Sequence, residues 1–265
     1  MRRSDRNFRP KYETPRRRSL GGDQVEGRQA VRELLRAGTR NVDYIWLEDT
    51  VIRKGIISEI AELAVTRRIP LLTMSRRRFE SASSSEGSQG ILAKASPLRD
   101  KDLTEMVEES NSPFLVVIEG ITDPHNLGAV LRSAELAGAT GIVLPQNRAT
   151  LVTPTVTKTA AGAVEYLNFS LVAGIPTALS LLESLGVTTI GLDVQASSSI
   201  FDLGLIGQGP VAIVLGAEDK GLSRLSRERC QHRVKIPQVG KLDSLNVSAA
   251  AAVGFFEIQR LRMSS

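Results

Sequence analysis

Ser244-Leu245-Asn246-Val247-Ser248 lies shortly after Ile236-Pro237 and directly before the apolar stretch 249–261. This order places a polar cluster at the mouth of a C-terminal helix. Two upstream segments, 126–134 and 214–222, also combine an apolar run with a turn of small and polar residues. Three separated stretches of this design predict one composite site.

Short apolar runs, each followed by a helix-like segment, predict an α/β fold around this site. Runs that are apolar on both faces are typical of parallel strands covered by helices. Ligands bind beyond the carboxyl ends of such strands, where the loops 119–126, 216–221 and 237–246 carry most of the polar candidates. The predicted strands are 114–118, 141–144, 188–192, 211–215 and 233–236, and the predicted helices are 127–137, 154–163, 176–185 and 247–261.

A smaller α/β unit is predicted ahead of this sheet. Its first helix should run over 25–35 and end at Gly38, and strands and a second helix alternate up to 72. An arginine run over 76–78 and a Ser/Gly-rich stretch over 81–90 follow, and the mostly polar segment 96–113 marks the domain junction. The expected organisation is a basic disordered tail over 1–22, an α/β domain over 23–96, a linker over 97–112 and a second domain over 113–265.

The positive charge of the chain is concentrated at its N-terminus. The net charge is +5, but residues 1–20 alone carry +6, which leaves the remaining 245 residues at −1. Such a tail is either an arm that sits on phosphate or a solvated segment without a partner. A transit peptide is less favoured, because the tail has no evident apolar face and contains two acidic residues.

Several functional classes find no support in the sequence. A single cysteine, Cys230, excludes a disulfide framework and fits a reducing cytoplasm or an organelle matrix. No apolar run approaches the roughly 18 residues of a membrane span, so a soluble protein is expected. The glycine-rich nucleotide-binding motifs, HExxH and GxSxG are missing from the sequence, and no metal site is predicted. His125 reads as a structural histidine, and Ser244 and Ser248 read as helix caps or hydrogen-bonding groups.

Three motifs resemble those of a known enzyme family. Asn126-x-Gly128-x-x-x-Arg132, Gly216-x-Glu218-x-x-Gly221 and the segment from Ile236-Pro237 to Ser248 are similar, in this order, to motifs one to three of the TrmH/SpoU branch of the SPOUT superfamily. That resemblance implies S-adenosyl-L-methionine (AdoMet)-dependent methylation of an RNA ribose 2′-hydroxyl. It also implies a deep trefoil knot in the C-terminal domain and a homodimer whose interface builds the active site.

The resemblance also assigns roles to single residues. The implied catalytic set is Asn126, Arg132, Glu218, Ser244 and Asn246, and the implied cofactor contacts are Leu215, Gly216, Gly221, Ile236 and Leu245. Spacing alone leaves Arg132 either an exposed helix residue or part of an anion site. Because a guanidinium stays protonated near neutrality, we expect Arg132 to clamp a phosphate and stabilise the developing alkoxide, and the proton acceptor stays open. Arg28, Arg76, Arg77, Arg78 and Lys241 are expected to contact RNA.

Two parts of the sequence narrow the choice of substrate. The first domain, from Glu26–Val31 to Gln89–Ile91, and the Thr122–Asn126 lead-in to motif one resemble the family members that methylate a guanosine ribose in the peptidyl-transferase loop of 23S rRNA. We therefore expect a cytoplasmic rRNA methyltransferase. Alternatives are the same chemistry on tRNA or another rRNA site, including a methylation that confers antibiotic resistance, and a catalytically idle RNA-binding or ribosome-assembly protein. A small-molecule methyltransferase is the least favoured reading.

Overall fold

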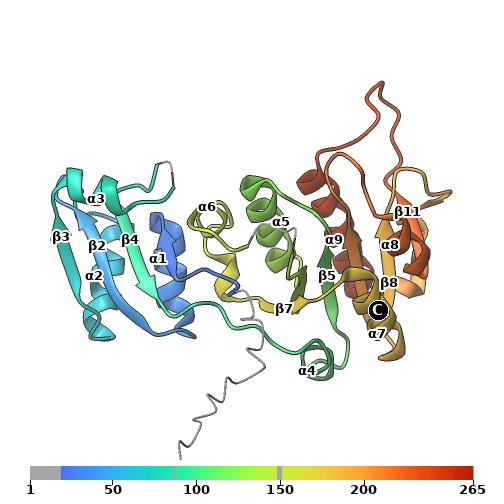
Figure 1. The fold of residues 1–265 in the computed structure, drawn as a ribbon, viewed down its shortest axis with the longest axis horizontal. Helices are drawn as coiled ribbons and strands as arrows, with labels where there is room; N and C mark the ends of the chain where they lie inside the picture. Colours follow the sequence, from blue (N-terminus) through green and yellow to red (C-terminus); the bar gives the residue numbers. More distant parts are fainter. Residues whose placement is uncertain (1–18, 86, 148–150, 265) are drawn as a thin grey trace, which may run out of the picture.

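Two separate β-sheets organise the chain in the computed structural model, which describes residues 19–85, 87–147 and 151–264 (Figure 1). The predicted tail therefore lies almost entirely outside the described residues. The first sheet has four strands in the order β1-β4-β2-β3, and only β2 and β3 are parallel. Its unit consists of β1 (Gln24–Glu26), α1 (Arg28–Ala37), β2 (Val42–Glu48), α2 (Ile56–Thr66), β3 (Leu71–Met74), α3 (Arg76–Ala82) and β4 (Ile91–Ala95).

The first helix begins later than its apolar spacing predicts. Val25 pairs with Ala93 in the sheet, and Gly27, at φ 94°, adopts a backbone conformation that a helix does not use. Helix α1 therefore starts at Arg28 and ends, as predicted, at Gly38 in the left-handed region. The arginine run 76–78, for which no element was predicted, begins helix α3, and the fully buried Phe79 anchors one face of this helix.

The second sheet has the order β7-β6-β5-β10-β8-β11-β9, and every neighbouring pair is parallel, which confirms the predicted sheet type. The unit built around this sheet consists of α4 (Leu103–Glu108), β5 (Phe114–Ile118), α5 (Pro124–Leu136), β6 (Gly141–Pro145), α6 (Pro154–Thr159), β7 (Asn168–Val172), α7 (Ile175–Ser184), β8 (Thr188–Leu192), β9 (Ser198–Ser199), β10 (Val211–Leu215), α8 (Arg224–Arg229), β11 (His232–Lys235) and α9 (Val247–Met263), with short 3-10 turns at 163–165, 200–202 and 204–208. Short elements without a clear periodicity, among them β7 and α8, were not predicted.

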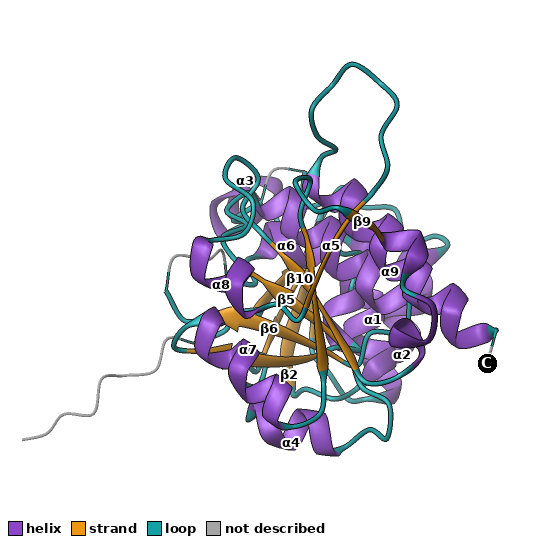
Figure 2. Ribbon diagram, turned by 90° about the vertical axis from the view of Figure 1, so that its right-hand side faces the viewer, coloured by secondary structure: helices purple, strands orange, loops and turns teal. Residues whose placement is uncertain are grey.

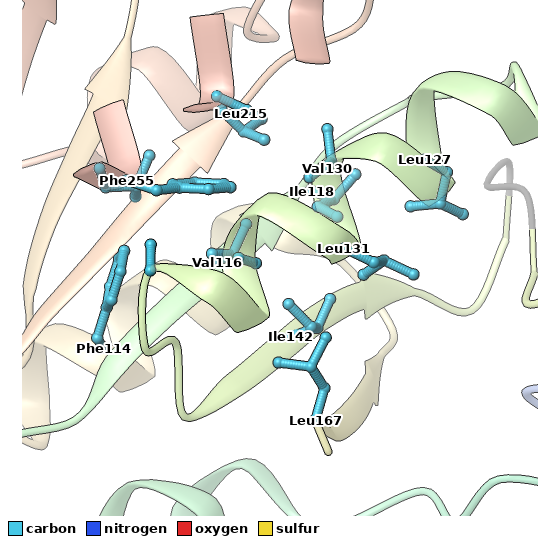
Figure 3. Packing of buried hydrophobic residues seen from close by; sticks show 14 of the residues in the cluster. Phe114, Val116, Ile118, Leu127, Val130, Leu131, Ile142, Leu167, Leu215 and Phe255 are labelled. Carbon is cyan, nitrogen blue, oxygen red and sulfur yellow. The ribbon is translucent and has the colours of Figure 1, made fainter. Parts of the chain in front are cut away.

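Strand β5 shows why this sheet needs helices on both sides. Phe114, Val116 and Ile118 point into a core shared with α5 and α9, whereas Leu115 and Val117 point into a second core shared with α4 and α7 (Figures 2 and 3). All five side chains are at most 1% exposed. The segment 97–112, expected to be a linker, thus contains a helix that packs against the sheet.

A buried ion pair joins the two units. Arg40, after α1, donates from Nε to Glu165 Oε2 (2.8 Å) and also donates to the backbone carbonyls of Gly22 (2.7 Å) and Ser96 (2.8 Å). The side chains of Arg40 and Glu165 are 5% and 0% exposed. Removing one partner of such a pair typically costs about 3–5 kcal/mol, because the other charge is left buried and unpaired. The Tyr166 hydroxyl adds a second link by donating to Glu33 (2.8 Å).

None of the helices within the described ranges is both long and apolar enough to cross a membrane.

Candidate active site

A relay of side-chain amides brings the three sequence motifs together at the carboxyl edge of the parallel sheet. Asn126, in the first turn of α5, donates from Nδ2 to Glu218 Oε1 in the loop after β10 (2.8 Å). Asn246, at the start of α9, donates from Nδ2 to Asn126 Oδ1 (3.0 Å). We call Glu218, Asn126 and Asn246 the amide relay. The predicted composite site is thereby placed around three residues that are 92 and 120 positions apart in sequence.

Helix capping sets the direction of this relay. Asn246 is the N-cap of α9, and its Oδ1 accepts the Ser248 backbone N–H (2.9 Å) and the Ser248 hydroxyl (2.6 Å). Since Oδ1 is occupied, only the amino group of Asn246 faces Asn126, and Asn126 must present its own amino group to Glu218. Of the two readings given for Ser244 and Ser248, helix caps or hydrogen-bonding groups, the second holds for Ser248. The cap is Asn246, because its side chain reaches the free N–H at the second helical position.

Beside the relay lies a cavity of 360 Å³, formed by the segments that follow β8, β10 and β11. All five residues predicted to contact a cofactor line it, together with Glu218 and Ser244: they are Leu215, Gly216, Gly221, Ile236 and Leu245. Asn126, Asn246 and Arg132 lie outside its lining. The predicted set thus divides into residues of the cavity wall and residues beside it.

The loop after β10 explains the two glycines of motif two. Ala217 and Gly221 exchange backbone hydrogen bonds of 2.9 and 2.8 Å, which closes a tight turn below Glu218. A Cβ on Gly216 would lie 2.1 Å from the Gly221 carbonyl carbon, and Gly221 itself has φ +62°. Only glycine at 216 allows the two strands of the turn to approach this closely.

The glycine of motif one has a packing role. A Cβ on Gly128 would lie 2.6 Å from Thr159 Cβ, so its absence lets α5 approach α6 closely. The Thr159 hydroxyl is also within 3.4 Å of His125 Nδ1, and His125 lies outside the cavity lining, as expected for a structural histidine. Burial raises the pKa of the Cys230 thiol to about 12, so this cysteine is no candidate nucleophile.

Arg132 is not brought to the relay or to the cavity within this chain. It is exposed on α5, six residues or about 9 Å of helix rise beyond Asn126. Among the described residues it forms no ion pair and no hydrogen bond. Of the predicted RNA contacts, Arg28 and Arg76 line a separate cavity on the first unit, Arg77 and Arg78 are exposed on α3, and Lys241 is exposed in the protruding loop 237–246 (Figure 2).

Asp193 belongs to the site and was missed from the sequence. Asp193 follows β8 and lines the cavity, where its buried carboxylate pairs with Arg227 (3.1 Å) and Arg233 (3.6 Å). The rule that ligands bind beyond the carboxyl ends of strands would have found it, because the strand 188–192 was predicted. The two hydrogen bonds that Ser248 donates to Asn246 Oδ1 could be found only in the structure. Within the described ranges no group of three His, Cys, Asp or Glu residues is arranged to hold a metal ion.

Solved structures of RNA-modifying enzymes share this fold. The structure titled as the SpoU methyltransferase AviRb from Streptomyces viridochromogenes superposes with a TM-score of 0.76 over 91% of this chain and 90% of that chain, at 22% identity, and so shares the fold. A crystal structure of an RNA 2′-O ribose methyltransferase superposes with a TM-score of 0.74 over 91% of this chain and 88% of that one, at 27% identity.

Sequence comparison gives the family. The model of the SpoU rRNA methylase family matches residues 113–256, and a model described as RNA 2′-O ribose methyltransferase substrate binding matches 24–101. The chain is 36% identical, over 91% of its length and 97% of the relative, to the 23S rRNA (guanosine-2′-O-)-methyltransferase RlmB of Pseudomonas putida. It is 32% identical to YacO of Bacillus subtilis, whose name assigns it to the TrmH family and leaves tRNA and rRNA open as substrates, over 91% and 96%. The chain belongs to the SpoU rRNA methylase family.

The relay yields a prediction that separates geometry from stability. In Asn246→Asp the carboxylate still caps α9, but the donor to Asn126 is lost, so Asn126 turns and releases Glu218. We expect the free energy of unfolding to change by less than about 1 kcal/mol, because the cap is kept. The methyl-transfer rate should fall on the order of 100-fold, because the site is misaligned. Denaturant unfolding and single-turnover kinetics measure the two quantities.

Asn246→Ala is the matched control, since it removes the cap as well and should also lose about 1 kcal/mol of stability. A near-normal transfer rate in Asn246→Asp would show that the relay does not orient the site.

Proposed function

We propose that this chain transfers the methyl group of AdoMet to the ribose 2′-hydroxyl of a guanosine in 23S rRNA. The amide relay is the main support for this proposal, because it joins motifs one, two and three beside a cavity whose wall contains every predicted cofactor contact. The relatives named as 23S rRNA guanosine methyltransferases match almost the whole chain, which favours this substrate and, with it, the cytoplasm. The name of YacO supports tRNA as the second candidate.

The residues of the cavity fit AdoMet. Its volume of 360 Å³ lies in the range of small-molecule sites, about 300–1,000 Å³. Leu215, Ile236 and Leu245 offer apolar walls to an adenine ring, and the glycine turn exposes backbone groups to polar edges. Glu218 and Asp243 are carboxylates in the same wall and suit a ligand that carries a sulfonium and an ammonium charge. Bound AdoMet supplies a methyl group on a good leaving group.

The protein then has to align the 2′-oxygen and stabilise the charge that develops on it. We assign Asn126 and Asn246 to the orientation of Glu218, and Ser244, in the cavity wall, to a hydrogen bond near the reacting groups. Arg132 holds an RNA phosphate and stabilises the alkoxide as the proton leaves. A guanidinium suits this task because it binds phosphate through two parallel N–H groups.

A homodimer would bring Arg132 to the site. In the single chain Arg132 is exposed and outside the cavity, so its proposed role needs the cavity of a second chain. Helices α5 and α9 pack against each other and expose Leu136 (58%) and Phe256 (45%). We therefore propose that these two helices form the interface with a second chain, and that each active site combines the cavity of one protomer with Arg132 of its partner.

We also propose that α9 closes a trefoil knot. This helix is in close contact with the connection between β8 and β10: a Cβ on Gly254 would lie 3.2 Å from Leu192 and 3.4 Å from Ile200 in that connection, and one on Gly207 would lie 2.4 Å from Leu261 of α9. Near the end of α9, Arg262 also donates to the carbonyl of Gly209 in this connection (2.7 Å) and to that of Pro113, directly before β5 (3.1 Å). These contacts are those expected if α9 passes through the connection.

The proposed division of labour follows the predicted domains. Residues 23–96 bind RNA, residues 113–265 transfer the methyl group, and residues 97–112 link the two.

The activity is tested with labelled AdoMet and unmodified rRNA and tRNA pools. We expect label on a single guanosine of 23S rRNA, recovered as an alkali-resistant 2′-O-methyl nucleotide. Arg132→Ala should reduce the rate at least about 100-fold, as expected for loss of a group that stabilises transition-state charge. Label on tRNA alone would transfer the proposal to the second candidate. Binding of both RNA and AdoMet without any label, on assembling ribosomal particles as well, would favour an idle RNA-binding protein.

Mixing two inactive variants tests the shared site. In a dimer of Arg132→Ala with Glu218→Gln, one of the two sites keeps both native residues if Arg132 acts across the interface. After exchange of subunits, about a quarter of the wild-type activity should return, since half of the dimers are mixed and each has one intact site. If Arg132 acts within its own chain, both sites of the mixed dimer are defective and no activity returns.

A further inference from the structure

A second, larger cavity of 1050 Å³ lies on the first unit, apart from the cofactor cavity. It is bordered by α3, by the turn after β2 and by a segment that we call the serine loop, Ser83–Ser85 together with Gly87–Gln89. This segment belongs to the Ser/Gly-rich stretch 81–90. In the structure a buried carboxylate accepts several of its hydrogen bonds.

Glu26 is that carboxylate, and it is completely buried. It accepts the backbone N–H groups of Ser84 (2.7 Å) and Ser85 (3.0 Å), the Ser83 hydroxyl (2.8 Å) and the Ser85 hydroxyl. Burial alone would raise the pKa of Glu26, but these bonds outweigh it and lower the pKa, so the group is ionised at neutral pH. A buried charge spent on fixing a surface loop indicates that the shape of this loop matters.

Cationic groups face the cavity from both sides. Arg28 is oriented by Gln89, which accepts the Arg28 backbone N–H at Oε1 (2.9 Å) and the Arg28 Nε–H at its carbonyl (3.3 Å). No other hydrogen bond of this guanidinium occurs among the described residues, so most of its five donors remain available. Lys54 is exposed and, in the described part of the chain, forms no ion pair.

The carboxylates of the lining already have partners. Glu80 pairs with Arg76 (2.8 Å), and Glu48 accepts the Thr50 hydroxyl (2.6 Å). The lining also has an apolar side, where Val51 is half-buried and Ile52 is 70% exposed. One cavity thus combines serine hydroxyls, available cations and an apolar wall.

This combination matches the chemistry of a nucleotide whose base has left its stack: a charged phosphate, polar base edges and an apolar ring face. We infer that the cavity of the serine loop binds an unpaired nucleotide of the RNA substrate. The inference rests on the proposed function only in taking RNA as the substrate. A base inside a duplex presents neither its face nor its pairing edge, so the site selects unpaired RNA.

Two contacts connect this cavity to the amide relay. Lys158 of α6 donates to the carbonyl of Gly87 in the serine loop (3.4 Å), and its neighbour Thr159 contacts His125 (3.4 Å), the residue before Asn126. A nucleotide held in the cavity therefore anchors the RNA next to the methyl-transfer site. The expected role is to set which nucleotide of the substrate reaches Glu218.

The test fills the cavity. Ser88→Tyr puts a large side chain into it, and Ser81→Tyr puts the same side chain on the exposed face of α3, outside the lining. The full chain is titrated with an unpaired oligoribonucleotide taken from the unmodified 23S rRNA transcript. Ser88→Tyr should weaken binding about tenfold or more, the usual effect of losing one stacked or enclosed base, while Ser81→Tyr and the AdoMet affinity of both variants stay as in the wild type.

Ultraviolet crosslinking of the same oligoribonucleotide to the wild-type chain, mapped by mass spectrometry, makes the test independent of how the variants fold. Crosslinks to the serine loop or to 50–54 are expected, and they should be absent with the oligonucleotide paired in a duplex. Wild-type affinity in Ser88→Tyr together with crosslinks elsewhere would overturn the inference and leave the proposed methylation intact. Crosslinks in the cavity without methyl transfer to any RNA would support the inference and contradict the proposed methylation.

Discussion

The rest of the site depends on one hydrogen bond, which the backbone N–H of Ser248, in the first turn of α9, donates to Asn246 Oδ1. This cap consumes the oxygen of the amide, so the amino group must face Asn126, and Asn126 in turn must face Glu218. Secondary structure, rather than a dedicated scaffold, thereby fixes the orientation of a carboxylate that is far away in sequence. The parallel sheet makes this possible, because it gathers the ends of β5, β10 and β11 at one edge.

Much of this edge could be predicted from the sequence. The runs 114–118 and 211–215 were apolar at every position, and the structure buries every residue of both strands. The resemblance to the family's motifs implied that Leu215, Gly216, Gly221, Ile236 and Leu245 belong to one site, and they line one cavity. The pattern of apolar strands alone predicted that the site lies beyond the carboxyl ends of the strands.

Other features depend on tertiary contacts that no local pattern contains. The helix over 25–35 was shortened because Val25 is claimed by the first sheet and Gly27 breaks the helix, although the apolar spacing extends through it. Nothing in the composition of the Ser/Gly-rich stretch indicates that the distant Glu26 accepts hydrogen bonds from Ser84 and Ser85. Arg132 matched the motif, yet the structure leaves it exposed and outside the cavity of its own chain, a placement that the motif does not contain.

Coupling between Asn126 and Asn246 tests the relay most directly. The rate of methyl transfer is measured at saturating AdoMet for Asn126→Ala, Asn246→Ala and the double variant. If the two amides act only through each other on Glu218, the double variant should be no slower than the slower single variant, with a coupling energy of at least about 1.5 kcal/mol. Additive losses would contradict the account, because they would mean that each side chain contributes to the reaction independently.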